Sequence, residues 1–97
     1  KRLAVLPNVP TFAEVGLVPV NRMAYYGLLG PAGMSKEAID KIHAGVQKVL
    51  QDPAVRKRIE DTGSLIVGNT PDQFAAEIKA EYEIYKEVVA KQNLNLN

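Results

Sequence analysis

Two prolines, Pro7 and Pro10, constrain the start of this chain more than any other feature of its sequence. Proline has no amide hydrogen and pushes the residue before it away from helical angles, so regular structure ends where these residues stand. Thr11 then follows as a helix N-cap, with Glu14 at the third position of a capping box. The next glycine supplies a left-handed closing residue. We predict a single short helical turn over residues 11–15.

Three short apolar segments, each bounded by charge, proline or glycine, have the composition of buried strands. They cover residues 3–6, 23–29 and 64–68. Residues 17–22 contain Pro19 and show no helical period, so this stretch is predicted as an extended linker.

Two helices are predicted in the middle of the chain from apolar residues at three- and four-residue spacing and from their capping residues. The first covers residues 36–51 after Ser35, and the second covers residues 53–62 after Asp52. The apolar face of the first carries Ile39, Ile42, Val46, Val49 and Leu50.

A long last helix is predicted over residues 71–92. Thr70 caps it and is followed by a first-turn proline, an acidic residue and a glutamine at the box position. Residues 93–97 are polar and are predicted to be frayed. The apolar stripe of this helix carries Phe74, Ile78, Tyr82, Tyr85, Val88 and Val89.

Strands that alternate with helices predict the α/β class, with too few strands for a complete doubly wound sheet. We therefore expect the apolar faces of helices 35–51 and 71–92 to be buried against a sheet that contains residues 24–29.

The sequence offers little for catalysis or for metal binding. His43 is the only histidine and there is no cysteine, so no transition-metal site is predicted. Ser35 and Ser64 are explained as a cap and a strand-edge residue, and no base stands ready to activate either one. No glycine-rich phosphate loop is present, and a net charge of +1 argues against nucleic acid as a partner. We predict no enzyme, no catalytic residue and no cofactor.

Two stretches, Leu6–Gly16 and Tyr26–Gly33, together resemble the double signature of the Bug (TctC-like) family, the periplasmic solute-binding proteins of tripartite tricarboxylate transporters. The first follows the pattern L-P-x-V-P-T-x-x-E-x-G, and the second has an aromatic residue, glycine, two hydrophobic residues and G-P-A-G. Asp52–Arg56 and Gly68–Phe74 also look like family landmarks. The resemblance covers essentially the whole chain.

The resemblance implies the C-terminal part of a two-domain, periplasmic-binding-protein-like fold. Residues 1–22 would end the second lobe and include the hinge crossing, at Leu17–Met23. Residues 23–97 would form the C-terminal part of the first lobe, with the long terminal helix. The whole receptor would bind a small carboxylated metabolite in the periplasm and deliver it to membrane transporter subunits, with most of the site in an N-terminal portion outside this chain.

The same resemblance places Ala24, Tyr25 and Tyr26 near the ligand cleft, as candidate substrate-binding residues. Neighbouring residues of an extended segment point to opposite faces, so one tyrosine ring can pack inward while the other meets the cleft. Ala24 departs from the family pattern, which usually has serine there.

Two alternatives remain open from the sequence. One is a stand-alone α/β interaction module without a ligand, and the other is a small enzyme domain with an unrecognised site. The upstream reading frame separates these readings, since further α/β sequence and a signal peptide would favour the receptor.

Overall fold

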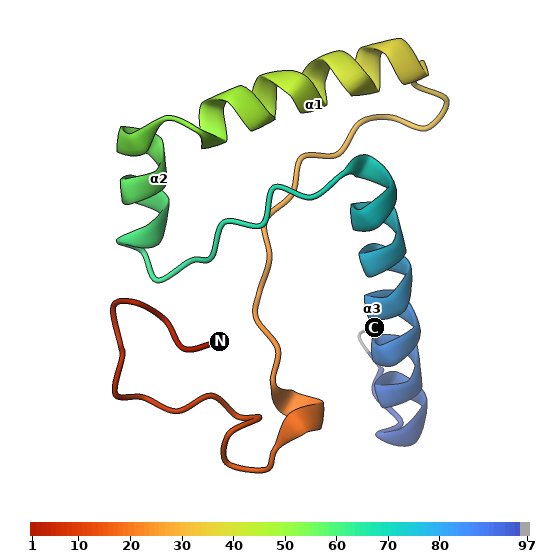
Figure 1. Cartoon of the computed structure of the whole chain (residues 1–97). Helices are drawn as coiled ribbons and strands as arrows, with labels where there is room; N and C mark the ends of the chain where they lie inside the picture. Colours follow the sequence, from red (N-terminus) through yellow and green to blue (C-terminus); the bar gives the residue numbers. More distant parts are fainter. Residues whose placement is uncertain (96–97) are drawn as a thin grey trace.

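The computed structural model describes residues 1–95 of the chain. Its elements are a 3₁₀ turn, η1 (Val18–Val20), followed by the helices α1 (Lys36–Leu50), α2 (Pro53–Glu60) and α3 (Pro71–Lys91). In Figure 1, α1 runs across the top, with α2 and α3 below its opposite ends and an extended segment rising between them.

All three predicted helices form, and each begins at the predicted cap. The Ser35 hydroxyl accepts from the Ala38 amide at 3.2 Å. The Asp52 carboxylate accepts from the first-turn amides of α2. Thr70 makes the full capping box of α3: its hydroxyl accepts from the Gln73 amide at 3.2 Å, and its own amide donates to the Gln73 side chain at 2.9 Å. These starts are confirmed because each depends only on residues within one helical turn.

The short turn that begins at Thr11 is also confirmed. The Glu14 amide donates to the Thr11 hydroxyl at 3.2 Å, the Thr11 amide donates to the Glu14 carboxylate at 2.8 Å, and the Val15 amide closes the turn on the Thr11 carbonyl. Gly16 has the predicted left-handed conformation, with φ of 85°.

The predicted α/β class is wrong for the described residues, which contain helices and no strand. Residues 3–6 form a turn that the Leu6 amide closes on the Leu3 carbonyl at 3.0 Å. Segments 23–29 and 64–68 run without helical structure, and within residues 1–95 no backbone hydrogen bond ties either one to a neighbouring segment. An apolar composition favours a strand, but a strand forms only where another backbone lies beside it.

The expected burial against a sheet is also wrong. No residue in the described part of the chain is fully buried. Ile39 and Val46 of α1 are half-buried, and Ile42 between them is 45% exposed. On α3, Phe74 and Ile78 are half-buried, whereas the rest of the predicted stripe is exposed. The helical period identified the correct faces, but the layer expected to cover them is not among the described residues.

Two boundaries differ from the predictions for local reasons. The linker 17–22 contains η1, because the Val20 and Asn21 amides reach carbonyls three residues back. The end of α3 is closed rather than frayed: Asn93 has φ of 50°, and the Leu94 amide donates to the Val89 carbonyl at 3.1 Å, as in a Schellman motif. Leu96 and Asn97, the end of the predicted frayed tail, lie outside the described residues.

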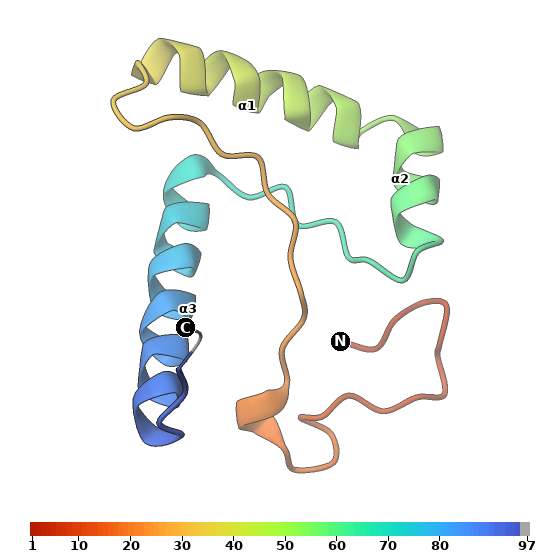
Figure 2. The same ribbon diagram turned by 180° about the vertical axis from the view of Figure 1, so that it is seen from behind.

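The chain is flat and open, with extents of 41 × 39 × 23 Å. Figure 2 shows the same arrangement from behind, with the segment that follows η1 rising toward α1 between α3 on one side and α2 with the N-terminal stretch on the other. This segment carries all three candidate ligand-contact residues.

Candidate functional site

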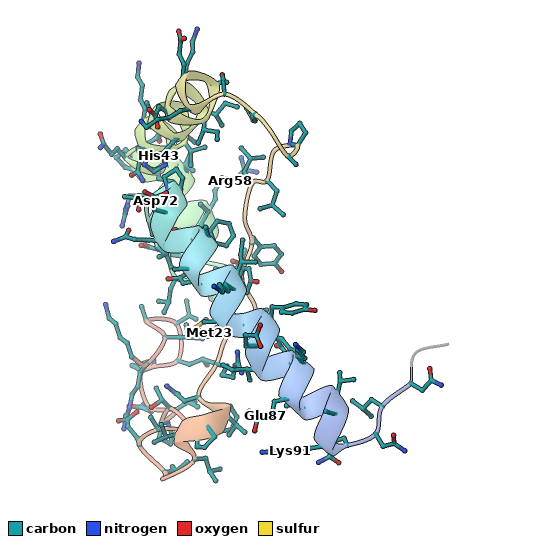
Figure 3. All side chains as sticks on the ribbon, turned by 90° about the vertical axis from the view of Figure 1, so that its right-hand side faces the viewer. Met23, His43, Arg58, Asp72, Glu87 and Lys91 are labelled. Atoms are coloured by element: carbon teal, nitrogen blue, oxygen red, sulfur yellow. The ribbon has the colours of Figure 1, made fainter. Side chains whose placement is uncertain are left out.

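The candidate site is built on residues 22–27, which pack along α3 between Phe74 and Tyr85. Arg22 pairs with Glu81 and stacks over the Tyr85 ring, with its guanidinium carbon 5.2 Å from the ring centroid. Tyr25 meets Phe74 edge to face, with ring centroids 5.8 Å apart. Figure 3 shows Met23 lying against the middle of α3. Side chains spaced along one side of α3 therefore hold the segment in place.

The Arg22–Glu81 pair is the most shielded ion pair of the described residues, with side chains 27% and 29% exposed. The hydrogen bond to the Glu81 carboxylate raises the pKa of Arg22 above its usual value, so this guanidinium stays charged. Four other pairs are more exposed and join neighbouring turns of one helix, as Glu87 and Lys91 do near the end of α3 in Figure 3. Arg22 therefore joins the predicted hinge crossing to α3.

Gly27 allows the close approach of this segment to α3. A Cβ atom placed on Gly27 would overlap the Phe74 ring. The same ring also contacts Tyr25, so Phe74 holds the segment at two points. A side chain at position 27 would have to push the ring or the segment away.

The three sequence-predicted site residues lie together on this segment but face different surroundings. Tyr26 is 92% exposed, and Tyr25 is 54% exposed with its ring against Phe74. Ala24 is exposed. Both tyrosines are exposed, but the Tyr25 ring contacts α3 whereas Tyr26 faces solvent.

A shallow depression of about 270 Å³ lies between this segment and α3. Its walls are Met23, Tyr25, Glu77, Ala80 and Glu81. Of the two carboxylates in this lining, Glu81 is paired with Arg22, which leaves Glu77 as the second acidic group.

Other chemistry is sparse in the part of the chain that the structure describes. No group of three or more His, Cys, Asp or Glu side chains gathers closely enough to hold a metal ion. His43 is half-buried on α1. Within residues 1–95, no helix has both the length and the apolar character needed to cross a membrane.

Sequence reasoning missed the partners of the candidate segment. Arg22 appeared in it only as the end of a linker, and Glu81 was not singled out. No local pattern connects these two residues, which are far apart in the chain. Two sequence features could have pointed to this packing: Arg22, at the end of the predicted hinge, and Gly27, directly after two tyrosines.

Comparison with known proteins gives a family match over residues 1–94, to the tripartite tricarboxylate transporter family receptor. Two curated relatives are similar over 93 residues. One is a UPF0065 protein in the tcbD-tcbE intergenic region of Pseudomonas sp. (strain P51), 28% identical over 95% of this chain. The other is a UPF0065 protein in the TAR-I ttuE-ttuC' intergenic region of Agrobacterium vitis, 30% identical over 93% of this chain.

The matched region spans 28% of the Pseudomonas protein and 27% of the Agrobacterium protein. The chain therefore corresponds to little more than a quarter of the length of these relatives. No solved structure matches the chain significantly.

Proposed function

The chain belongs to the tripartite tricarboxylate transporter family of receptors, and from this premise we propose that it is part of an extracytoplasmic receptor for a small carboxylate. In this proposal the whole receptor works in the periplasm and hands its ligand to membrane subunits of the transporter. The family match over residues 1–94 is the observation that carries the proposal. No catalytic step is assigned to it.

We further propose that residues 1–22 end one lobe and include the hinge crossing, and that residues 23–97 belong to the other lobe. The Arg22–Glu81 pair supports this division, because it ties the end of the crossing to α3. Bending on ligand binding would then take place before Arg22, in the segment that contains η1. Hinges commonly lie in such segments between regular elements.

Ala24, Tyr25 and Tyr26 are proposed to line the ligand side of this lobe. Tyr26 supports this role best, since its ring is 92% exposed and its hydroxyl can donate to a carboxylate. Ala24 lies two residues before Tyr26, and alternate residues of an extended segment share a face. Tyr25 supports the segment from behind through its contact with Phe74.

Titration calorimetry of the full-length receptor with succinate and citrate tests the proposal. We expect binding of at least one of them, and weak or absent binding by the 97-residue chain alone, because a cleft needs both walls. Failure of the receptor to bind either compound would count against a carboxylate ligand. Tight binding by the short chain would show that the whole site lies within these residues.

The variant Tyr26→Phe tests the proposed contact residue. It removes only the hydroxyl, and a hydrogen bond to a charged group contributes about 1.5–3 kcal/mol. We expect the affinity of the receptor for its carboxylate to fall about ten- to a hundredfold. Tyr82→Phe is the matched control, because Tyr82 is also exposed, at 63%, but lies on α3. Equal affinities for the two variants would remove Tyr26 from the site.

A further inference from the structure

The exposed surface of this chain is much too large for a self-contained unit. It amounts to 8468 Å², whereas a folded monomer of 10.6 kDa exposes about 5,500 Å². The radius of gyration is 16.7 Å, against about 12–13 Å for a compact domain of this length. About 3,000 Å² of surface is thus exposed beyond what a compact chain would leave in contact with water.

Part of this surplus lies on segment 23–29, which is covered on one face only. Met23, Tyr25 and Gly27 face α3, as their contacts with its side chains show. The residues between and beyond them are open: Tyr26 is 92% exposed and Leu28 is 69% exposed.

Segment 64–68 repeats this asymmetry. Ser64, Ile66 and Gly68 are half-buried, and the Gln47 amide of α1 donates to the Gly68 carbonyl. The alternate residues are exposed, with Val67 at 71%. Four exposed side chains of the two segments are leucine or valine, and we call them the uncovered aliphatic residues. They are Leu28, Leu29, Leu65 and Val67.

We propose that the uncovered aliphatic residues form a contact surface for the remainder of the receptor polypeptide. The relatives are long enough to supply such a covering, since the matched region is only 28% of the Pseudomonas protein. The size of the surplus favours the same polypeptide over a second copy. A standard interface takes about 800 Å² from each partner, far less than the area left open on this chain. The proposal rests on family membership and not on carboxylate binding, so it stands or falls separately from the ligand.

Single cysteines report directly on this covering, because the chain has no cysteine of its own. Leu28→Cys and Val67→Cys are placed in a cysteine-free form of the full-length receptor and also in the 97-residue chain, and the rates of maleimide labelling are measured. Lys36→Cys is the control, since the Lys36 side chain is 88% exposed on a charged part of α1.

We expect both thiols to react rapidly in the 97-residue chain. In the full-length receptor their labelling rates should be at least about a hundredfold lower, since a covered site reacts only after local opening. The control should react at similar rates in both. Rapid labelling of both test positions in the full-length receptor would overturn the proposal. Slow labelling of both thiols already in the 97-residue chain would also overturn it. If that labelling becomes slower as the concentration of the short chain rises, a second copy of the chain is the occupant.

Discussion

The three helices and the two extended segments of this chain respond differently to the same lack of a core. Each helix forms with the cap that its own sequence supplies, although no described residue is fully buried. Segments 23–29 and 64–68 have strand-like composition and yet form no backbone hydrogen bond to another segment of residues 1–95. The difference shows that a helix satisfies its hydrogen bonds within one stretch of sequence, whereas a strand depends on a neighbouring strand, which the described residues do not supply.

The largest expected effect breaks the contact between an extended segment and a helix. Gly27→Ala places a Cβ where the Phe74 ring lies, and overpacking of this kind costs about 1–3 kcal/mol. We expect a lower unfolding midpoint of the full-length receptor in urea. An unchanged midpoint would mean that Phe74 moves aside at no cost and that the contact does not hold the segment.

A smaller effect is expected at the start of α3. Thr70→Ala removes the hydroxyl that accepts from the Gln73 amide, and the loss of an N-cap costs about 1 kcal/mol. Circular dichroism during chemical denaturation should show a lower midpoint, while Thr70→Ser should keep the wild-type midpoint. Equal midpoints for the alanine and serine variants would reject the capping role.

Gly45→Ala makes the same substitution as Gly27→Ala, but inside a helix, and so sharpens the comparison between helices and extended segments. Gly45 lies in the interior of α1, and nothing within 4 Å would meet an added Cβ. Alanine is favoured over glycine in a helix by about 0.5–1 kcal/mol, so we expect greater stability rather than less. A loss of stability, measured in the same urea titration, would indicate that position 45 is covered in the full-length receptor.

The smallest effect concerns the turn at Thr11 and is expected only in acid. The Arg2 guanidinium, with help from the Thr11 amide, lowers the pKa of Glu14 from its usual 4.5 to about 2. A depressed pKa means that the contribution of this carboxylate is fully present above pH 4.5 and is lost as the pH falls through about 2. Titration of the Glu14 side chain by NMR should show this low midpoint, and Arg2→Gln should raise it. A midpoint near 4.5 in the wild-type chain would contradict the contact with Arg2.

The same division explains what the sequence could predict. The helix starts at Ser35, Asp52 and Thr70 were predictable, because cap and amide lie within three residues of one another. The α/β class was not predictable in this way, because whether a segment forms a strand depends on other segments that pair with it. The predicted C-terminal ends of the helices lie one or two residues beyond the observed ends, because the last turn of a helix is often irregular.

The candidate site shows the same limits. Ala24, Tyr25 and Tyr26 could be singled out by family resemblance, and the contrast between Tyr25 at 54% and Tyr26 at 92% exposed agrees with backbone alternation. The Arg22–Glu81 pair could not be foreseen, because it depends on how the segment lies along α3. The hinge crossing at Leu17–Met23 was a prediction from the sequence, and the pair adds a contact between the end of that segment and α3.

Amide hydrogen exchange, measured on the 97-residue chain and on the full-length receptor, tests the central claim most directly. The claim is that the helices are specified locally and that segments 23–29 and 64–68 depend on the rest of the receptor. We predict that amides inside α1 and α3 exchange more slowly than those of the two segments in the short chain. In the full-length receptor the segments should become protected as well. Segments that are already protected in the short chain, or that stay unprotected in the receptor, would contradict this account.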